Sequence, residues 1–144
     1  MFGQDRNAMR KVFFKAWKKH RAQEKLAPME TLLVQIISLH PEYHYLFDNE
    51  KNLAQDFSAA TDTPNPFLHL SLHLAVQEQL SLKNPAQLPD LYQQLIKKYS
   101  DPHKAEHEIM ECLSEMIWQL QHNPGKVDES QYMECLRKKI SGTV

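Results

Sequence analysis

The chain has 144 residues, of which 42% are hydrophobic, and its formal net charge is −1. This size suits one compact domain, so we expect a single helical domain over residues 1–144. Three glycines, and eleven Val plus Ile against eighteen leucines, disfavour a β-rich fold, because hairpins need glycine and strands favour β-branched residues. The expected fold class is all-α, a single-domain bundle of about six helices. No stretch reaches the roughly 20 apolar residues of a membrane span, and no signal peptide is recognisable, so we expect a soluble cytoplasmic protein.

The N-terminal segment 1–25 concentrates positive charge. It holds eight Lys or Arg residues against two acidic residues, a net charge of +6, so the remainder of the chain carries −7. Phe13 and Trp17 recur at helical spacing, which predicts a basic amphipathic first helix. We expect its apolar face to pack on an acidic body while its lysines face water. The alternative is that residues 6–25 dock a protein partner; binding to nucleic acid is not expected.

Prolines and capping side chains divide the rest of the chain into further helices. Asn65 and Asp101 each precede a proline, which is the arrangement of an N-cap followed by the first helical position. Residues 48–65 are polar and aperiodic, which predicts the longest loop. The expected segments after the first helix are a helix over 29–40, a short turn or helix over 41–47, helices over 66–80, 90–99 and 103–121, and a last helix that Asp128 caps and that runs through 131–140.

The two cysteines are interpreted as packing residues. Cys112 and Cys135 are too few for a disulfide framework or for a zinc site with four thiolates. Each is followed by an apolar neighbour, Leu113 or Leu136. We therefore expect both cysteines to be reduced and packed against apolar side chains.

Histidine carries the strongest functional signal of the sequence. Six of the eight histidines form three HxxxH pairs, more than chance would give: His40 and His44, His69 and His73, His103 and His107. Residues four apart lie on one face of a helix, where two imidazoles can reach a common ion. Pairs on three helices can meet in a bundle core, and burying six imidazoles without partners would cost several kcal/mol. The sequence therefore predicts a metal centre with these six histidines as ligands.

Acidic and amide side chains extend two of these histidine stripes. Glu111 follows His107 by four residues and completes an HxxxHxxxE run, so it is a further candidate metal ligand. The candidates for residues that contact the ligands are Gln77, Glu78 and Glu115. The alternative interpretation is that the histidines are core or cap residues hydrogen-bonded to carbonyls, Tyr43, Tyr92 or Glu108. A serine nucleophile elbow and a glycine-rich phosphate loop are both missing from the sequence, which disfavours those chemistries.

Three longer strings carry a family resemblance: HPEYH at 40–44, NPFLHLSLHLAVQEQ at 65–79 and AEHEIMECLSEMIW at 105–118. They resemble a bacterial family catalogued as domain of unknown function 1841, and the likeness covers nearly the whole chain, to YMECL at 132–136. The resemblance implies a small cytoplasmic bacterial protein and implies no activity or substrate. The all-α, histidine-rich pattern is also distantly similar to hemerythrin-like metal bundles, but the order and spacing of their ligands differ from those here.

The sequence as a whole predicts a helical bundle that holds one or two divalent transition-metal ions. Nitrogen-rich sites with a carboxylate suit iron, zinc or manganese, and the sequence does not choose among them. Iron would bring the handling of oxygen, peroxide or nitric oxide, whereas zinc would bring hydrolysis or structural stabilisation. The alternative is a non-enzymatic protein-interaction module with structural histidines and a basic docking helix. Enzymatic activity is neither predicted nor excluded.

Overall fold

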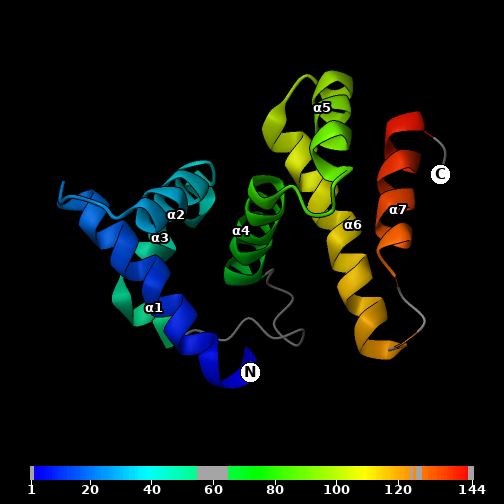
Figure 1. Ribbon diagram of the computed structural model, residues 1–144. Helices are drawn as coiled ribbons and strands as arrows, with labels where there is room; N and C mark the ends of the chain where they lie inside the picture. The colour runs from blue at the N-terminus through cyan, green and yellow to red at the C-terminus, as the bar shows by residue number, and fades with distance from the viewer. Residues whose placement is uncertain (1, 55–64, 124, 126–127, 143–144) are drawn as a thin grey trace. The chain divides into compact units, whose positions relative to one another are not determined.

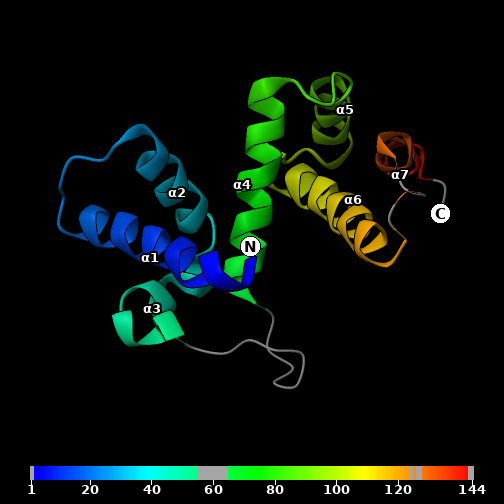
Figure 2. The ribbon, with the colours of Figure 1, turned by 60° about the horizontal axis from the view of Figure 1, so that its bottom comes forward.

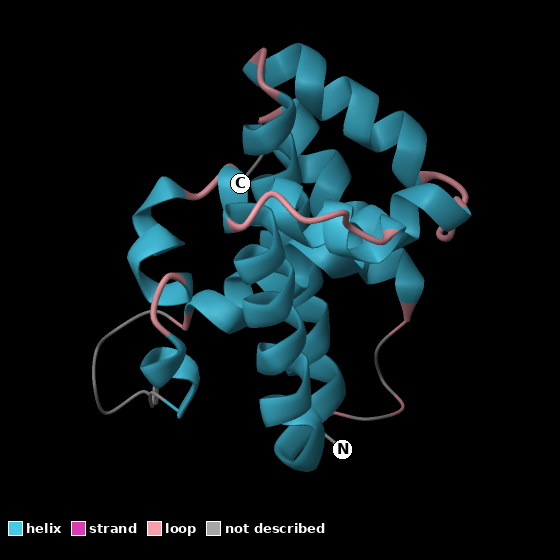
Figure 3. Cartoon of the chain, turned by 90° about the vertical axis from the view of Figure 1, so that its left-hand side faces the viewer, coloured by secondary structure: helices cyan, strands magenta, loops and turns pink. Residues whose placement is uncertain are grey.

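Helices form all the regular structure in the part of the chain that the computed structural model describes, residues 2–54, 65–123, 125 and 128–142 (Figures 1 and 3). The all-α prediction is confirmed. Among these residues no helix is both long and apolar enough to cross a membrane. The elements are α1 (Phe2–Arg21), α2 (Pro28–Ser38), the 3-10 helix η1 (Pro41–Tyr43), α3 (His44–Phe47), the 3-10 helix η2 (Glu50–Ala54), α4 (Pro66–Leu82), α5 (Leu88–Tyr99), α6 (Pro102–His122) and α7 (Glu129–Ser141).

The chain forms two compact units, Met1–Leu70 and Ser71–Val144, here called unit 1 and unit 2. α4 begins in unit 1 and continues into unit 2. The segment 48–65, predicted as a loop, contains the 3-10 helix η2 near its start. Residues 55–64 of this segment lie outside the described residues. That residues 1–144 form a single domain stays a prediction.

Unit 1 is built on the apolar face of α1. Phe13 and Trp17, one helical turn apart, are 0% and 2% exposed. The ring of Phe13 lies 6.2 Å from that of Phe47 on α3, and α2 contributes Leu33 and Ile37 to the same buried set. Figures 1 and 2 both show α1 running beside α2, with α3 against it. The predicted apolar face of the basic helix is therefore its packing face.

The cations of α1 are in part neutralised inside unit 1. Near the end of α1, Lys18 pairs with Glu50 at 3.3 Å and Arg21 with Asp48 at 3.0 Å. Asp48 also accepts a hydrogen bond from Trp17 Nε1 at 2.8 Å, so one carboxylate binds both the Trp17 indole and the Arg21 guanidinium. Hydrogen bonds from Arg21 are the main cause that lowers the pKa of Asp48. Unit 1 thus supplies acidic partners to two cations near the end of α1.

Unit 2 is built from α5, α6 and α7, which pack against one another, together with the part of α4 after Leu70. Its buried apolar side chains come from all four helices, for example Val76, Leu95, Ile109 and Leu136, each 0% exposed. Both α6 and α7 begin as predicted. The Asp101 carboxylate accepts from the backbone N–H of His103 at 3.0 Å, and Asp128 accepts from that of Ser130 at 2.9 Å.

The prediction of reduced cysteines is wrong in this structure. Cys112 on α6 and Cys135 on α7 form a disulfide, with their Cα atoms 5.9 Å apart. Packing of α7 against α6 brings the two side chains together, which residue spacing along the chain could not show. The bond ties the two helices of unit 2 to each other.

Candidate metal centre

The start of α6 positions two of the predicted histidines. The Asp101 cap and Pro102 fix where the helix begins, so His103 lies in its first turn and His107 one turn later. The two rings are edge to face, with their centroids 4.2 Å apart. The HxxxH spacing therefore places both imidazoles on one face of α6, as the sequence predicts.

His73 of α4 completes a group of three imidazoles in unit 2. It is 1% exposed, and its ring centroid lies 5.1 Å from that of His103 and 4.8 Å from that of His107. Each residue offers a ring nitrogen within 4.8 Å of the others. We call His73, His103 and His107 the unit 2 histidine cluster. Three nitrogen donors, of which that of His73 is buried and those of His103 and His107 are partly exposed, suit a transition-metal ion.

A buried carboxylate fixes the orientation of His73. Glu106 is 4% exposed, and its Oε1 lies 2.9 Å from His73 Nδ1. Because a carboxylate accepts, Nδ1 carries the proton, and Nε2 of the neutral imidazole keeps its lone pair. The other carboxylate oxygen accepts from Gln77 Nε2 at 2.8 Å. Carboxylates that hold a histidine in this way commonly support metal-binding imidazoles.

Nε2 of His73 lies close to a second histidine, at a distance that fits a shared ion. His73 Nε2 and His107 Nε2 are 3.0 Å apart. Bonds of roughly 2.0–2.1 Å from nitrogen to metal would place two ligands of one ion about 2.9 Å apart at a right angle and about 3.3 Å apart in a tetrahedron. The observed separation lies in this range, and it also allows a hydrogen bond between the two rings. The cluster can therefore accept an ion with little movement of these two side chains.

Unit 1 contains a second pair of the same design. His40 is 2% exposed, and its Nδ1 donates to the Ile36 carbonyl at 2.8 Å, which leaves Nε2 as the lone-pair nitrogen. That Nε2 lies 3.1 Å from Nε2 of His69 on α4. The Asn65 side chain caps the start of α4, accepting from Phe67 N at 3.0 Å, and so sets the position of His69. We call His40 and His69 the unit 1 histidine pair.

The sixth predicted ligand has a different environment. His44 Nε2 donates to the Ile37 carbonyl at 3.1 Å, and its ring lies 4.7 Å from that of Trp17. Its described contacts are thus to backbone and to the aromatic core of unit 1. The sequence predicts that His40 and His44 share one helix face, but α2 ends at Ser38 and α3 begins at His44, so the two residues do not lie on one helix. The structure places His69 against His40 instead.

The predicted carboxylates lie elsewhere in unit 2. Glu111 forms an ion pair with Lys139 of α7 at 3.3 Å, and its side chain is 73% exposed. Glu115 is exposed and accepts from Gln119 at 3.1 Å, and Glu78 is exposed. Of the predicted contact residues, Gln77 is the one that reaches the buried Glu106.

Glu106 is the residue that sequence reasoning missed. It stands three residues after His103, and residues three apart share a helix face as well as residues four apart do. Counting only steps of four from His103 leads to Glu111 and passes over this carboxylate. The i, i+3 spacing was the available signal.

The family described as "Domain of unknown function (DUF1841)" matches residues 5–138 of the chain. Neither the curated proteins nor the solved structures gave a match.

Proposed function

The chain belongs to the DUF1841 family, and we propose that it binds one or two divalent transition-metal ions. The first ion is held by the unit 2 histidine cluster, His73, His103 and His107, with Glu106 hydrogen-bonded to His73. The observation that carries the proposal is the pair of Nε2 atoms 3.0 Å apart, one of them on an imidazole whose proton is held at Nδ1 by a carboxylate.

Burial favours a bound ion over an unliganded cluster. His73 and Glu106 are almost fully buried, while His103 and His107 are partly exposed. Protonating neighbouring imidazoles together would place like charges within a few ångströms of each other, which is unfavourable. A divalent ion instead bonds to the lone pairs of neutral imidazoles, and the Glu106 carboxylate beside His73 supplies a negative charge.

The unit 1 histidine pair is the candidate for a second ion. Its Nε2 atoms are 3.1 Å apart, and the Ile36 carbonyl fixes the tautomer of His40 as Glu106 fixes that of His73. Two nitrogen donors alone bind more weakly than three. We therefore expect the unit 2 cluster to bind its ion more tightly than the unit 1 pair.

The donor set suits iron, zinc or manganese. Zinc with three histidines keeps a position for water and supplies Lewis-acid chemistry, and iron supplies redox chemistry with oxygen, peroxide or nitric oxide. In either case Glu106 would act on the ion through His73, because it contacts the imidazole by a hydrogen bond. The predicted cytoplasmic location and bacterial source belong to the same proposal.

Metal content tests the proposal directly. Wild-type protein from a metal-supplemented host is expected to carry close to one equivalent of transition metal or more by elemental analysis. The double substitution His73→Ala and His107→Ala is expected to lose the tighter ion. His122→Ala is the matched control: it lies on α6 too, but it is exposed and its Nδ1 donates to the Trp118 carbonyl.

The double substitution His40→Ala and His69→Ala separates one ion from two. If the unit 1 pair binds the second ion, this variant loses only the more weakly held metal. Wild-type protein that stays metal-free after incubation with iron, zinc and manganese, with an unchanged melting temperature, would refute the proposal. The alternative, an interaction module with structural histidines, would then be favoured.

Glu106→Gln tests the positioning role of the carboxylate. We expect it to weaken metal binding by roughly 10–100-fold in competition with a chelator, the range found for residues that orient metal-bound histidines. Glu115→Gln, an exposed position on the same helix, should leave the affinity unchanged. Equal affinities for the two variants would show that Glu106 does not support a metal ligand.

A further inference from the structure

The disulfide between α6 and α7 has one buried end and one accessible end. Cys112 of α6 is 1% exposed and belongs to the apolar core of unit 2. Cys135 of α7 is partly exposed and lines a cavity of about 1000 Å³, whose walls come from α5, α6 and α7. Cys112 is not part of this lining. A dissolved molecule that enters the cavity therefore reaches Cys135 and not Cys112.

The charges around the cavity do not exclude a thiolate. The lining holds four basic and three acidic side chains, which are Lys98, Arg137, Lys138, Lys139, Glu108, Glu111 and Glu134. Lys139 pairs with both Glu108 and Glu111, and Arg137 lies 3.9 Å from Glu134. Positive charge beside a sulfur favours its thiolate form, which is the reactive species in disulfide exchange.

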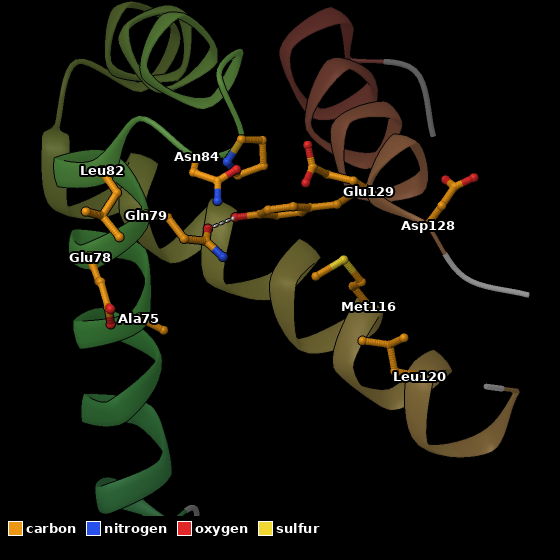
Figure 4. A pocket seen from close by; sticks show the side chains of 11 residues that line it. Ala75, Glu78, Gln79, Leu82, Asn84, Met116, Leu120, Asp128 and Glu129 are labelled. Carbon is orange, nitrogen blue, oxygen red and sulfur yellow. Dashed lines mark hydrogen bonds between the residues drawn. The ribbon is translucent and has the colours of Figure 1, made fainter. Parts of the chain in front are cut away.

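Two other contacts hold α7 in place on either side of Cys135. Three residues before it, Tyr132 is 1% exposed, and its hydroxyl donates to Gln79 Oε1 of α4 at 2.9 Å, the bond drawn dashed in Figure 4. Four residues after it, Lys139 donates to Glu108 of α6 at 2.7 Å. Neither contact involves a sulfur atom. The two cysteines should therefore stay close to each other when their bond opens, so that the bond can form again.

We propose that this disulfide is a reversible exchange site for a small thiol. The thiolate attacks Sγ of Cys135 from the cavity and forms a mixed disulfide with it, while the bond between the two cysteine sulfurs breaks. The electron pair of that bond leaves with Sγ of Cys112, which then takes a proton from water. In the reverse step the Cys112 thiolate attacks Sγ of Cys135 and expels the small thiol. The covalent link between α6 and α7 thus depends on the thiols around the protein.

A matched pair of variants compares the two sulfurs. Cys112→Ser keeps only the Cys135 thiol, and Cys135→Ser keeps only the Cys112 thiol. Each full-length variant is mixed with glutathione disulfide in the presence of a chelator, and intact mass follows the mixed disulfide. We expect Cys135 to react at least about tenfold faster than Cys112, because burial restricts access and disfavours the thiolate. The chelator makes the result independent of the metal centre proposed above.

The same reactions in guanidinium chloride are the control for the fold. Without the fold the two thiols should react at rates within about twofold of each other. Circular dichroism checks that each variant is folded before the native reaction begins. Equal rates for the two variants in the native state would overturn the proposal. So would a Cys135 thiol that reacts in guanidinium chloride but not in the folded protein, since the cavity would then not admit a small thiol.

The wild type tests whether exchange is reversible, without any substitution. It is equilibrated with mixtures of reduced and oxidised glutathione, and alkylation counts the free thiols. This ratio gives the effective concentration of the Cys112 thiol toward Cys135. In urea the flexible chain should give an effective concentration of about 1 mM, and the folded protein should exceed the urea value at least tenfold. A smaller ratio would show that the fold does not keep the sulfurs together, and the proposal would fail.

Discussion

The disulfide between α6 and α7 should make a large contribution to stability. Cys112 and Cys135 are 23 residues apart. In the chain-entropy treatment, a closed loop of this length lowers the entropy of the unfolded chain by about 11 cal/mol/K, or about 3.4 kcal/mol at 25 °C. The unfolding entropy is roughly 2.1 cal/mol/K per residue. If the chain unfolds in one cooperative transition, losing this stabilisation would therefore lower the melting temperature by about 11 °C. Reduction should therefore lower the melting temperature by about ten degrees.

Urea unfolding followed by circular dichroism, with and without a phosphine reductant, measures this contribution. Cys135 lines a surface cavity of unit 2, so the reductant has access to the bond. Cys135→Ala should unfold like the reduced wild type and should no longer respond to the reductant, which controls for effects of the reductant itself. A thiol titration must confirm two free thiols in the reduced wild type. A difference under about 1 kcal/mol between fully oxidised and fully reduced protein would refute the loop-entropy reasoning.

The same thiol count bears on the predicted cytoplasmic location. Cytosolic thiols are normally kept reduced, whereas disulfides persist in oxidising compartments. Rapid alkylation of thiols in intact cells would show whether Cys112 and Cys135 are bonded there. A bond present in the cell would count against the cytoplasmic prediction, and free thiols would agree with it.

Three further predictions concern the fold and its charges. Burial of Glu108 opposes its ionisation, but hydrogen bonds from Lys139 and Lys104 lower its pKa overall. The ionised carboxylate therefore stabilises the fold fully above the pKa of the unfolded chain, and this stabilisation is lost as the pH falls through the lower pKa of the folded state. Glu108→Gln should thus reduce the loss of stability in acid, as measured by urea unfolding at several pH values. Phe13→Ala should cost about 3–5 kcal/mol in the same assay, because the ring is 0% exposed, whereas Val12→Ala, 46% exposed, should change stability by less than about 0.5 kcal/mol. Gel retardation of duplex DNA should show no binding at physiological salt, and a shift that weakens steeply with salt would contradict this.

The sequence by itself determined the starts of α4 and α6 and the helix faces of the histidines that these two helices carry. Asn65 and Asp101 mark the starts of α4 and α6 because an N-cap side chain and a following proline act locally, within one turn. Given those starts, a spacing of four residues places His103 and His107 on one face whatever the rest of the chain does. The all-α class and the packing face of α1 followed from similarly local patterns of apolar residues.

Only the tertiary structure decided which side chains meet. Spacing alone predicts that His40 shares a helix face with His44, but α2 ends before His40, and His69 of α4 lies against it in unit 1. The same holds for Glu111. It follows His107 by four residues in the sequence, yet its carboxylate forms an ion pair with Lys139 of α7. The disulfide was missed for this reason too. Contacts between helices depend on how far each turns about its own axis and what packs opposite, and local spacing carries little information about either.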